Sequence, residues 1–342
     1  MSIQIHDLAT EGAHRVLKIH HEGSGLLAFL VLDDLRLGPA AGGVRTRTYP
    51  DERAALADAR SLASAMTLKC AISGLNAGGG KTVVMAHPQL QRHEAFRRLG
   101  EVIESLGGSY RTAGDVGTTR QDLETMGEVC SWVHSDESDL ARSVARGVLA
   151  ALRGAADAVQ APLLAQERAA VQGVGSVGAE VVRSLAAAGV RVTLSDLDAE
   201  RARRAAEATG ATVCPPESIW RQETELLIPC ALGGVIRPEH ASHPTARLVC
   251  GGANNVLSSP EVERTLTNAG LVFVPDFISS AGGVIDGIGE TVMGLDDRGP
   301  LIDALQETAY RVVAEARRSG ATASEVARSE ARRRLAGSGS GR

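Results

Sequence analysis

The amino-acid sequence predicts an α/β protein of two domains, in which the second domain has a doubly wound parallel sheet. From residue 168 onward, short apolar segments alternate with segments of helical periodicity, the order expected for parallel strands joined by crossover helices. The length of 342 residues accommodates two domains of ordinary size. A hydrophobic content of 44% and a charged content of 23% are typical of a soluble globular protein.

The first domain, residues 1–136, is expected to mix strands with helices. The run at 25–34 predicts a strand, because its side chains are mainly apolar. Asp51 precedes a segment in which Ala and Leu recur at helical spacing, so it predicts the N-cap of a helix over 52–66. A second helix is predicted over 89–106, because two glycines follow it as a C-terminal stop.

The second domain, residues 137–317, is expected to begin with a long helix over 135–159 that bridges the domains. The elements predicted after it are strands at 168–172, 190–196, 226–230, 246–250 and 271–277 and helices at 176–188, 199–210 and 301–319. A short polar helix follows, and the C-terminal helices over about 318–337 are expected to pack back on the first domain. The last five residues, 338–342, are predicted to be a disordered tail.

Composition and charge exclude several classes of function. The net charge of −5 gives no reason to expect nucleic acid. The sequence contains no run of about 18 apolar residues, so no membrane span is expected. The N-terminus does not resemble a signal peptide. The cysteines form no CxxC pair and no ligand-like cluster, so we expect reduced thiols in a cytoplasmic protein and no metal site. They are Cys70, Cys130, Cys214, Cys230 and Cys250.

A glycine motif predicts a dinucleotide site. The strand at 168–172 runs into Gly173-Val174-Gly175-Ser176-Val177-Gly178, which opens a helix. The first glycine makes the tight turn, the second admits the pyrophosphate, and the third lets helix and strand pack closely. The helix N-terminus then offers free N–H groups to the phosphates. An ordinary glycine turn is the alternative, because this motif alone is a weak signal.

An acid at the end of the next strand strengthens this prediction and selects the cofactor. Asp196 lies 23 residues after Gly173, where a carboxylate binds the adenosine ribose hydroxyls. Because that carboxylate repels a 2′-phosphate, the sequence favours NAD over NADP. Arg201 is close enough in sequence to keep NADP open.

The chain has only three lysines, Lys18, Lys69 and Lys81, against 33 arginines (36 Lys plus Arg, less 3). Arginine stays protonated in proteins, whereas lysine loses its proton when it is desolvated or set beside another cation. A retained lysine is therefore a candidate for proton chemistry. We interpret Lys18 as a chance surface residue, and Lys69 and Lys81 as functional, because they flank a glycine-rich turn in apolar surroundings.

Two interpretations of Lys81 compete. A phosphate-binding P-loop needs a glycine at position 75, which is leucine, and a strand leading into the loop, where a helical segment is expected. The preferred interpretation pairs Lys81 with Asp115, which sits on a glycine-flanked turn after a short strand at 110–113. Alone, Asp115 would be interpreted as an Asx-turn or helix N-cap.

Eight motifs in this chain resemble those of the amino-acid dehydrogenases acting on Glu, Leu, Phe and Val, especially the leucine, valine and phenylalanine branch. They occur in the family's order from about residue 15 to residue 330. They are LGPAAGGVR at 37–45, MTLK at 66–69, GLNAGGGKT at 74–82, AGDVGTT at 113–119, VQGVGSVG at 171–178, PCALGG at 229–234, GGANNV at 251–256 and PDFISSAGG at 275–283.

The resemblance implies oxidative deamination of an L-amino acid by NAD, in a cleft between a catalytic domain and a Rossmann domain of a homo-oligomer. The products would be a 2-oxo acid, ammonium and NADH. Lys69 would hold the substrate carboxylate with the backbone at Gly42 and Gly43. Lys81 would act as general base on the attacking water and later as acid. Asp115 would bind the amino group and tune Lys81, with Lys69 as the neighbouring cation.

The resemblance also implies the remaining contacts. Asn255 would bind the substrate amino group and Asn254 the nicotinamide ribose, although the two could exchange these roles. The pocket for the substrate side chain would include Ala41, Ala113, Val284 and Gly287. The cofactor would also contact Cys230, Ala231 and Ser143.

Four positions depart from the family pattern. A threonine that would bind the carboxamide aligns with Val144, with Ser143 as its substitute, and a family asparagine is Ser280. Ala41 occupies the position of a family leucine, and Gly287 that of a branched residue. These smaller residues are expected to enlarge the pocket for the substrate side chain, which favours phenylalanine or tryptophan as substrate over leucine or valine. Two other hypotheses stay open: a non-catalytic NAD-binding regulatory paralogue, and a different Rossmann oxidoreductase.

Overall fold

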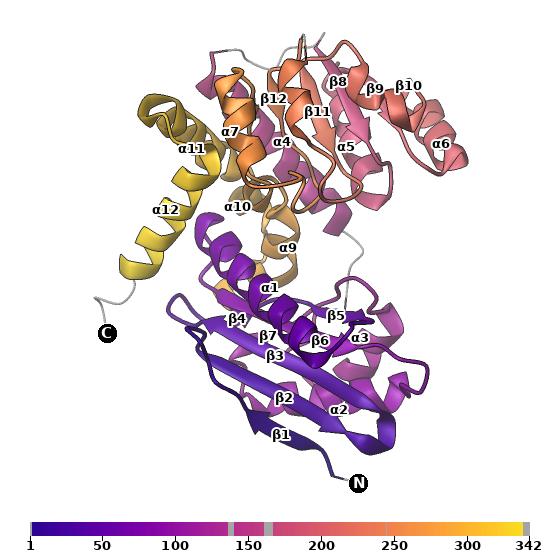
Figure 1. Cartoon of the computed structure of the whole chain (residues 1–342), viewed down its shortest axis with the longest axis vertical. Coiled ribbons are helices and arrows are strands. Elements are labelled where there is room, and N and C mark those ends of the chain that lie inside the picture. Colours follow the sequence, from indigo (N-terminus) through magenta and orange to yellow (C-terminus); the bar gives the residue numbers. More distant parts are fainter. Residues whose placement is uncertain (1, 136–139, 161–166, 244, 338–342) are drawn as a thin grey trace. The chain divides into compact units, whose positions relative to one another are not determined.

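The structure, a computed structural model, describes residues 2–135, 140–160, 167–243 and 245–337 (Figure 1). Its contacts divide the chain into two units. Unit 1 comprises Met1–Glu137, Gly287–Asp296 and Ala331–Arg342, and unit 2 comprises Ser138–Asp286 and Asp297–Glu330. The boundaries expected from the sequence differ, because 287–296 and 331–337 belong to unit 1 and 318–330 to unit 2. The predicted tail at 338–342 lies outside the described residues.

Unit 1 is built on a seven-stranded sheet in the order β1-β2-β3-β6-β4-β7, with β5 beside β6. The pairs β1/β2, β2/β3 and β3/β6 are antiparallel, and β4 and β5 run parallel to β6. The strands are β1 Gln4–Asp7, β2 Arg15–His21, β3 Leu26–Asp34, β4 Ala40–Ala41, β5 Val44–Arg47, β6 Gly78–Met85 and β7 Tyr110–Arg111. The strand predicted at 25–34 is β3.

Helices cover both faces of this sheet (Figure 1). They are α1 Glu52–Ile72, α2 Arg92–Ser105 and α3 Arg120–Gly127. The alternation of side chains in β3 divides the core: Phe29 and Val31 pack with alanines of α1, whereas Leu30 and Leu32 pack with α2. The predicted N-cap is present, because the Asp51 side chain accepts the Ala54 N–H at 2.7 Å. The helix is six residues longer than predicted and ends at Ile72.

The glycine-rich turn predicted before Lys81 is wrong, because Gly78, Gly79 and Gly80 begin the central strand β6. A Cβ at Gly79 would lie 2.2 Å from the Thr67 nitrogen of α1, and one at Gly80 would lie 2.7 Å from the Tyr110 ring. The glycines are therefore required by the close approach of helix and ring. This geometry also excludes the P-loop, since these backbone groups belong to a strand ladder.

Arg334 shows why the chain's last helix contributes to unit 1. This residue lies on α12 Ala323–Gly337, and its guanidinium donates to the carbonyls of Cys70 and Ala71 at the end of α1. It also donates to the Gly74 carbonyl and the Asn76 side chain, each at 2.9 Å. The guanidinium thus donates to carbonyls that the end of the helix leaves unpaired, and its charge is favourable at a helix C-terminus.

Unit 2 has a six-stranded, wholly parallel sheet in the order β10-β9-β8-β11-β12-β13. This confirms the predicted doubly wound fold, with the strand order reversing beside β8. The strands are β8 Arg168–Gln172, β9 Arg191–Ser195, β10 Thr212–Val213, β11 Leu226–Pro229, β12 Leu248–Val249 and β13 Val272–Phe273. A ligand of such a sheet binds at the carboxyl ends of the strands, where the order reverses.

The helices of unit 2 are α4 Leu140–Ala158, α5 Ser176–Ala187, α6 Ala199–Thr209, α7 Glu261–Asn268, α8 Asp276–Ser279, α9 Gly282–Met293, α10 Gly299–Asp303 and α11 Leu305–Ser319. The helices predicted in unit 2 are present in the predicted order, whereas α7, α8 and α9 were not predicted, and α8 begins within the strand expected over 271–277. The bridging helix is described from Leu140, since 136–139 lie outside the described residues. The helix expected over 301–319 is divided at Ala304, and α9 continues into unit 1. Within the described ranges, no helix is long and apolar enough to cross a membrane.

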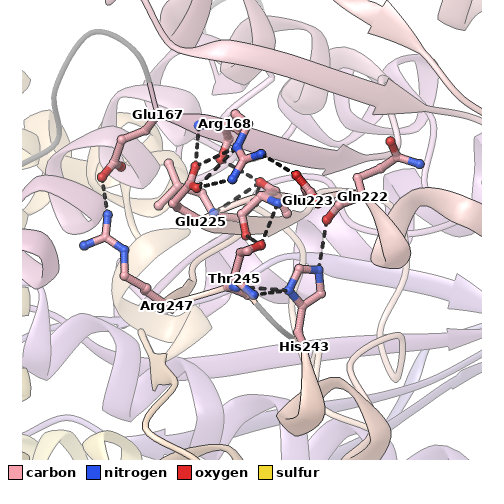
Figure 2. Close-up of polar contacts among 11 residues, drawn as sticks. Glu167, Arg168, Gln222, Glu223, Glu225, His243, Thr245 and Arg247 are labelled. Atoms are coloured by element: carbon pink, nitrogen blue, oxygen red, sulfur yellow. Dashed lines mark hydrogen bonds and ion pairs between the residues drawn. The ribbon is translucent and has the colours of Figure 1, made fainter.

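An ion-pair network ties the amino ends of the parallel strands together (Figure 2). Glu225 accepts from the Arg168 side chain at 2.6 Å and from its backbone N–H at 2.8 Å. Arg168 also reaches Glu223, and Arg247 pairs with Glu167. This end of the sheet is opposite the carboxyl ends, so we interpret the network as structural.

Glu225→Gln is expected to lower the free energy of unfolding by about 1–3 kcal/mol, because it weakens charge-assisted bonds to two donors of Arg168. The matched control is Glu223→Gln, whose side chain is 78% exposed and whose ion pair is worth at most about 1 kcal/mol. Urea unfolding of both variants measures the difference. Equal stabilities of the two variants would contradict a structural role for Glu225.

Candidate active site

Lys81 occupies the middle of unit 1. It lies on β6, opposite Val31 of β3, and its side chain is only 7% exposed. Its ammonium lies 2.5 Å from Oδ2 of Asp115. Burial lowers the pKa of Lys81, Asp115 opposes this shift, and the pKa stays below its ordinary value. The structure thus brings together the lysine and the acid that the sequence paired.

Glycines hold the turn of Asp115 against β6. A Cβ at Gly42 would lie 1.7 Å from the Gly80 carbonyl oxygen, and one at Gly43 would lie 2.5 Å from that of Gly114. Asp115 is not the helix cap, because Thr119 caps α3. Burial raises the pKa of Asp115, but Lys81 and Arg45 outweigh it, and the pKa lies below its usual value. Asp115 is therefore a carboxylate beside a lysine that gives up its proton readily.

Arg45, Asp58 and Tyr49 extend this site, and sequence reasoning missed all three. Arg45 of β5 donates to Asp115 at 3.0 Å and to Asp58 of α1 at 3.2 Å. The Tyr49 hydroxyl donates to the same Asp58 oxygen at 2.6 Å. Among the groups with the largest effect on the pKa of Lys81, the cation is Arg45, whereas the sequence had assigned this role to Lys69.

The other substrate-binding residues expected in the first domain surround the same strands. Ala41 is fully buried and pairs with Gly79 on one side and Arg111 on the other. The Ala113 carbonyl accepts the Val44 N–H at 2.9 Å. Lys69 is half-buried in the last turn of α1. It follows by two residues Thr67, whose backbone lies close to Gly79 of β6.

In unit 2, the glycine motif forms the tight turn that a dinucleotide requires. Gly173 has a φ of +86°, and a Cβ there would lie 2.5 Å from that of Ala231. A Cβ at Gly178 would lie 1.9 Å from the Gly173 carbonyl oxygen and 3.2 Å from the Cys230 side chain. Nothing lies within 4 Å of a Cβ built at Gly175, which caps α5 without a side-chain bond.

Ser176 and Val177 begin α5, so their backbone belongs to the same helix N-terminus. Open space at the second glycine and an uncapped helix N-terminus fit a pyrophosphate. Two buried polar atoms at the carboxyl ends of β8 and β9, Oε1 of Gln172 and Oγ of Ser195, have no hydrogen-bond partner. The residues present therefore fit a dinucleotide at this end of the sheet.

Asp196 is joined to the glycine turn. Its Oδ2 accepts the Val174 N–H at 2.8 Å, and its Oδ1 accepts the Asp198 N–H at 2.9 Å. Arg201 approaches Oδ1 at 3.4 Å and is half-exposed. Asp196, the residue expected to bind the ribose, thus also holds the glycine turn in place. Arg201, because of which NADP remained an alternative cofactor, lies directly beside it.

Two of the four departures from the family pattern, Val144 and Ser280, lie in unit 2. Cβ atoms built at Gly252 and Gly283 would meet methyls of Val144 at 3.6 and 2.9 Å, so the valine packs against glycine backbone. The Ser280 hydroxyl donates to Oδ1 of Asn254 at 3.1 Å. Serine thus contacts the asparagine expected to bind the cofactor.

The remaining expected residues are placed as follows. Asn255 has a φ of +53°, and its carbonyl accepts the Gly234 N–H at 2.8 Å. A Cβ at Gly282 would lie 1.9 Å from the Ser143 carbonyl oxygen. Val284 and Gly287 both lie on α9, in unit 2 and unit 1 respectively. That the residues of both units meet in one cleft stays a prediction.

Comparison with known proteins identifies the family. The family model described as Glu/Leu/Phe/Val dehydrogenase, dimerisation domain, matches residues 15–132, and that described as Glutamate/Leucine/Phenylalanine/Valine dehydrogenase matches residues 193–295. The leucine dehydrogenase of Bacillus cereus is 36% identical over 307 residues, covering 87% of this chain and 84% of its own. The valine dehydrogenase of Streptomyces albus is 34% identical, covering 95% and 93%.

A solved structure agrees with these relatives. The L-tryptophan dehydrogenase of Nostoc punctiforme is 31% identical over 334 residues, covering 96% of this chain and 94% of its own. Its crystal structure matches with a TM-score of 0.86 at 30% identity, covering 96% of this chain and 97% of that one. The chain therefore belongs to the Glu/Leu/Phe/Val dehydrogenase family and is an amino-acid dehydrogenase, an oxidoreductase that acts on a CH–NH₂ group.

Proposed function

We propose that this chain catalyses the reversible oxidative deamination of a large apolar L-amino acid, phenylalanine or tryptophan, with NAD. An L-amino acid, NAD⁺ and water give a 2-oxo acid, ammonium, NADH and a proton. The observation that carries the proposal is the buried Lys81, whose pKa is lowered and whose ammonium contacts Asp115. A lysine that is neutral near the working pH is what deprotonation of an attacking water needs.

The proposed roles follow from the chemistry of each side chain. Lys81 takes a proton from the water that attacks the imine carbon, and later returns one to the departing ammonia. The Asp115 carboxylate holds the substrate amino group and keeps Lys81 in place. Lys69, a cation on the last turn of α1, binds the substrate carboxylate with the backbone of Gly42 and Gly43. Asn255 is assigned to the amino group.

NAD, when bound, accepts the hydride from the substrate α-carbon. The residues that would hold it are the glycine turn at 173–178, Asp196, Cys230 and Ala231, together with Asn254 and Ser143. The support is the open space at Gly175 and the uncapped start of α5. The hydrogen bond from the Val174 N–H keeps the Asp196 carboxylate oriented.

The catalytic efficiency with NAD is expected to exceed that with NADP, because the Asp196 carboxylate repels a 2′-phosphate. Asp196→Asn keeps an acceptor for the Val174 N–H but removes the charge, and leaves Arg201 beside the phosphate position. It should raise the NADP-to-NAD ratio of kcat/KM at least about tenfold, and Asp196→Asn with Arg201→Ala should lose most of that gain. An NADP efficiency equal to that of NAD in the wild type would refute the assignment.

The reaction itself is tested by following NADH formation across a panel of L-amino acids at alkaline pH. Turnover with apolar members and none with glutamate or lysine supports the proposal, whereas no turnover with any amino acid sinks it. The non-catalytic paralogue predicts NADH binding without turnover. The packing of Val144 and the Ser280 contact with Asn254 bear on cofactor positioning. The Lys81–Asp115 pair is intact and supports an enzyme.

We also propose a homo-oligomer. The family model that matches residues 15–132 is described as a dimerisation domain. The edge strand β1 is exposed along its whole length, and no other strand of the described residues pairs with its outer edge.

A further inference from the structure

A chain of ion pairs leads from Lys81 to the surface of α1. The Lys81 ammonium and the Arg45 guanidinium both contact Oδ2 of Asp115, at 2.5 and 3.0 Å. Arg45 also contacts Asp58 at 3.2 Å, and the Tyr49 hydroxyl donates to the same Asp58 oxygen. The four charges therefore alternate in sign, and one arginine bridges the two carboxylates.

We propose that Arg45 and Asp58 are positioning residues for the reaction: Arg45 fixes Asp115 against Lys81, and the opposed charges of Arg45 and Asp58 set the pH at which Lys81 becomes a base. This inference rests on the proposed role of Lys81. Arg45 suits the task because its planar fork reaches two carboxylates at once, which a lysine ammonium does less well.

The elements packed around Lys81 supply the groups that act on it. Asp115 comes from the turn after β7, Arg45 from β5 and Asp58 from α1. Tyr110 of β7 stays neutral, since burial raises its pKa to about 12. On β3, Asp33 accepts a hydrogen bond from Thr67 at 2.6 Å, and burial raises its pKa. Lys69, in the last turn of α1, is assigned to the substrate carboxylate.

Arg45 and Asp58 act on Lys81 in opposite directions. Burial and the Arg45 charge lower the pKa of Lys81, whereas Asp115 and Asp58 raise it. Without Arg45, the Lys81 ammonium is no longer repelled by the guanidinium and no longer shares the Asp115 carboxylate with it, so the pKa of Lys81 rises. Without the Asp58 charge, the ammonium loses an attraction and Arg45 draws more strongly on Asp115, so its pKa falls.

The experiment compares the pH dependence of catalysis in three variants of the full chain. The steady-state rate constant kcat is measured at saturating amino acid and NAD, because Lys81 acts on the water that attacks the imine, a step that follows formation of the first NADH. The rate rises with pH as Lys81 loses its proton. The pH midpoint of this rise, here called the acid limb, should shift to higher pH by at least about half a unit in Arg45→Met. It should shift to lower pH by a similar amount in Asp58→Asn.

Arg45→Lys keeps the positive charge but lacks the planar guanidinium that contacts both carboxylates. Its acid limb should therefore lie close to that of the wild type, while the rate on the high-pH plateau stays reduced. Arg120→Met is the matched control, because it removes an arginine of the same unit whose side chain is 83% exposed, and its limb should not move. A purely structural role would lower the rate without shifting the limb in opposite directions.

The outcomes separate this inference from the proposed function. If Lys81→Ala retains turnover, the role of Lys81 is wrong. If Lys81→Ala is inactive while Arg45→Met and Asp58→Asn keep the wild-type limb or shift it the same way, only the role of the Arg45–Asp58 pair is overturned. If Arg45→Met does not fold, the downward shift expected for Asp58→Asn still decides.

Discussion

Lys81→Ala is expected to lower turnover at least about a hundredfold, the usual size of a general acid–base contribution, while NADH still binds. The reason is geometric as well as chemical. The Lys81 side chain is buried, its ammonium contacts Asp115, and burial lowers its pKa. Steady-state measurement of NADH formation gives the turnover, and fluorescence titration gives the affinity for NADH.

Two further variants sharpen this prediction. Lys81→Arg should be nearly as damaging, because a guanidinium keeps the charge and the ion pair but does not titrate. Lys18→Ala is the matched control: Lys18 pairs with Glu52, whose side chain is half-exposed, and turnover should stay close to that of the wild type. Wild-type turnover in Lys81→Ala would remove Lys81 from the mechanism.

The pairing of Lys81 with Asp115 could be anticipated from the sequence, but the strand that carries Lys81 could not. Lysine is rare in this chain, so each lysine is conspicuous, and the acid lies on a glycine-flanked turn. Three consecutive glycines, however, have low strand propensity and are typical of turns. They form β6 only because α1 and Tyr110 approach its backbone closely, which is a tertiary constraint.

The role of Arg45 could not be predicted from the sequence, because arginine, unlike lysine, is common in this chain. It is one of 33 arginines (36 Lys plus Arg, less 3), so its residue type carries no signal. Its partners lie 13 and 70 residues away, and no local spacing links them. The parallel sheet of unit 2 was predictable, because its strands and helices alternate with a clear period and the glycine motif marks one crossover.

Ala41→Leu is expected to shift the ratio of kcat/KM from phenylalanine toward leucine by at least about tenfold. One methylene in an apolar pocket is worth roughly 1–3 kcal/mol, or 10–200-fold, and this change adds more than one carbon. Ala41 is fully buried between β6 and β7, so a larger side chain there displaces a neighbour or occupies substrate space. Because both substrates are measured on one preparation, loss of folded enzyme cancels from the ratio.

Ala41→Gly serves as the matched control, since it enlarges the site and should not favour leucine. Ala41→Val should fall between the wild type and Ala41→Leu. The prediction depends on the wild type favouring aromatic substrates, as the small residues Ala41 and Gly287 suggest. A wild-type enzyme that prefers leucine or valine to every aromatic amino acid would mean that backbone fills the space left by these two residues, and the pocket argument would then be wrong.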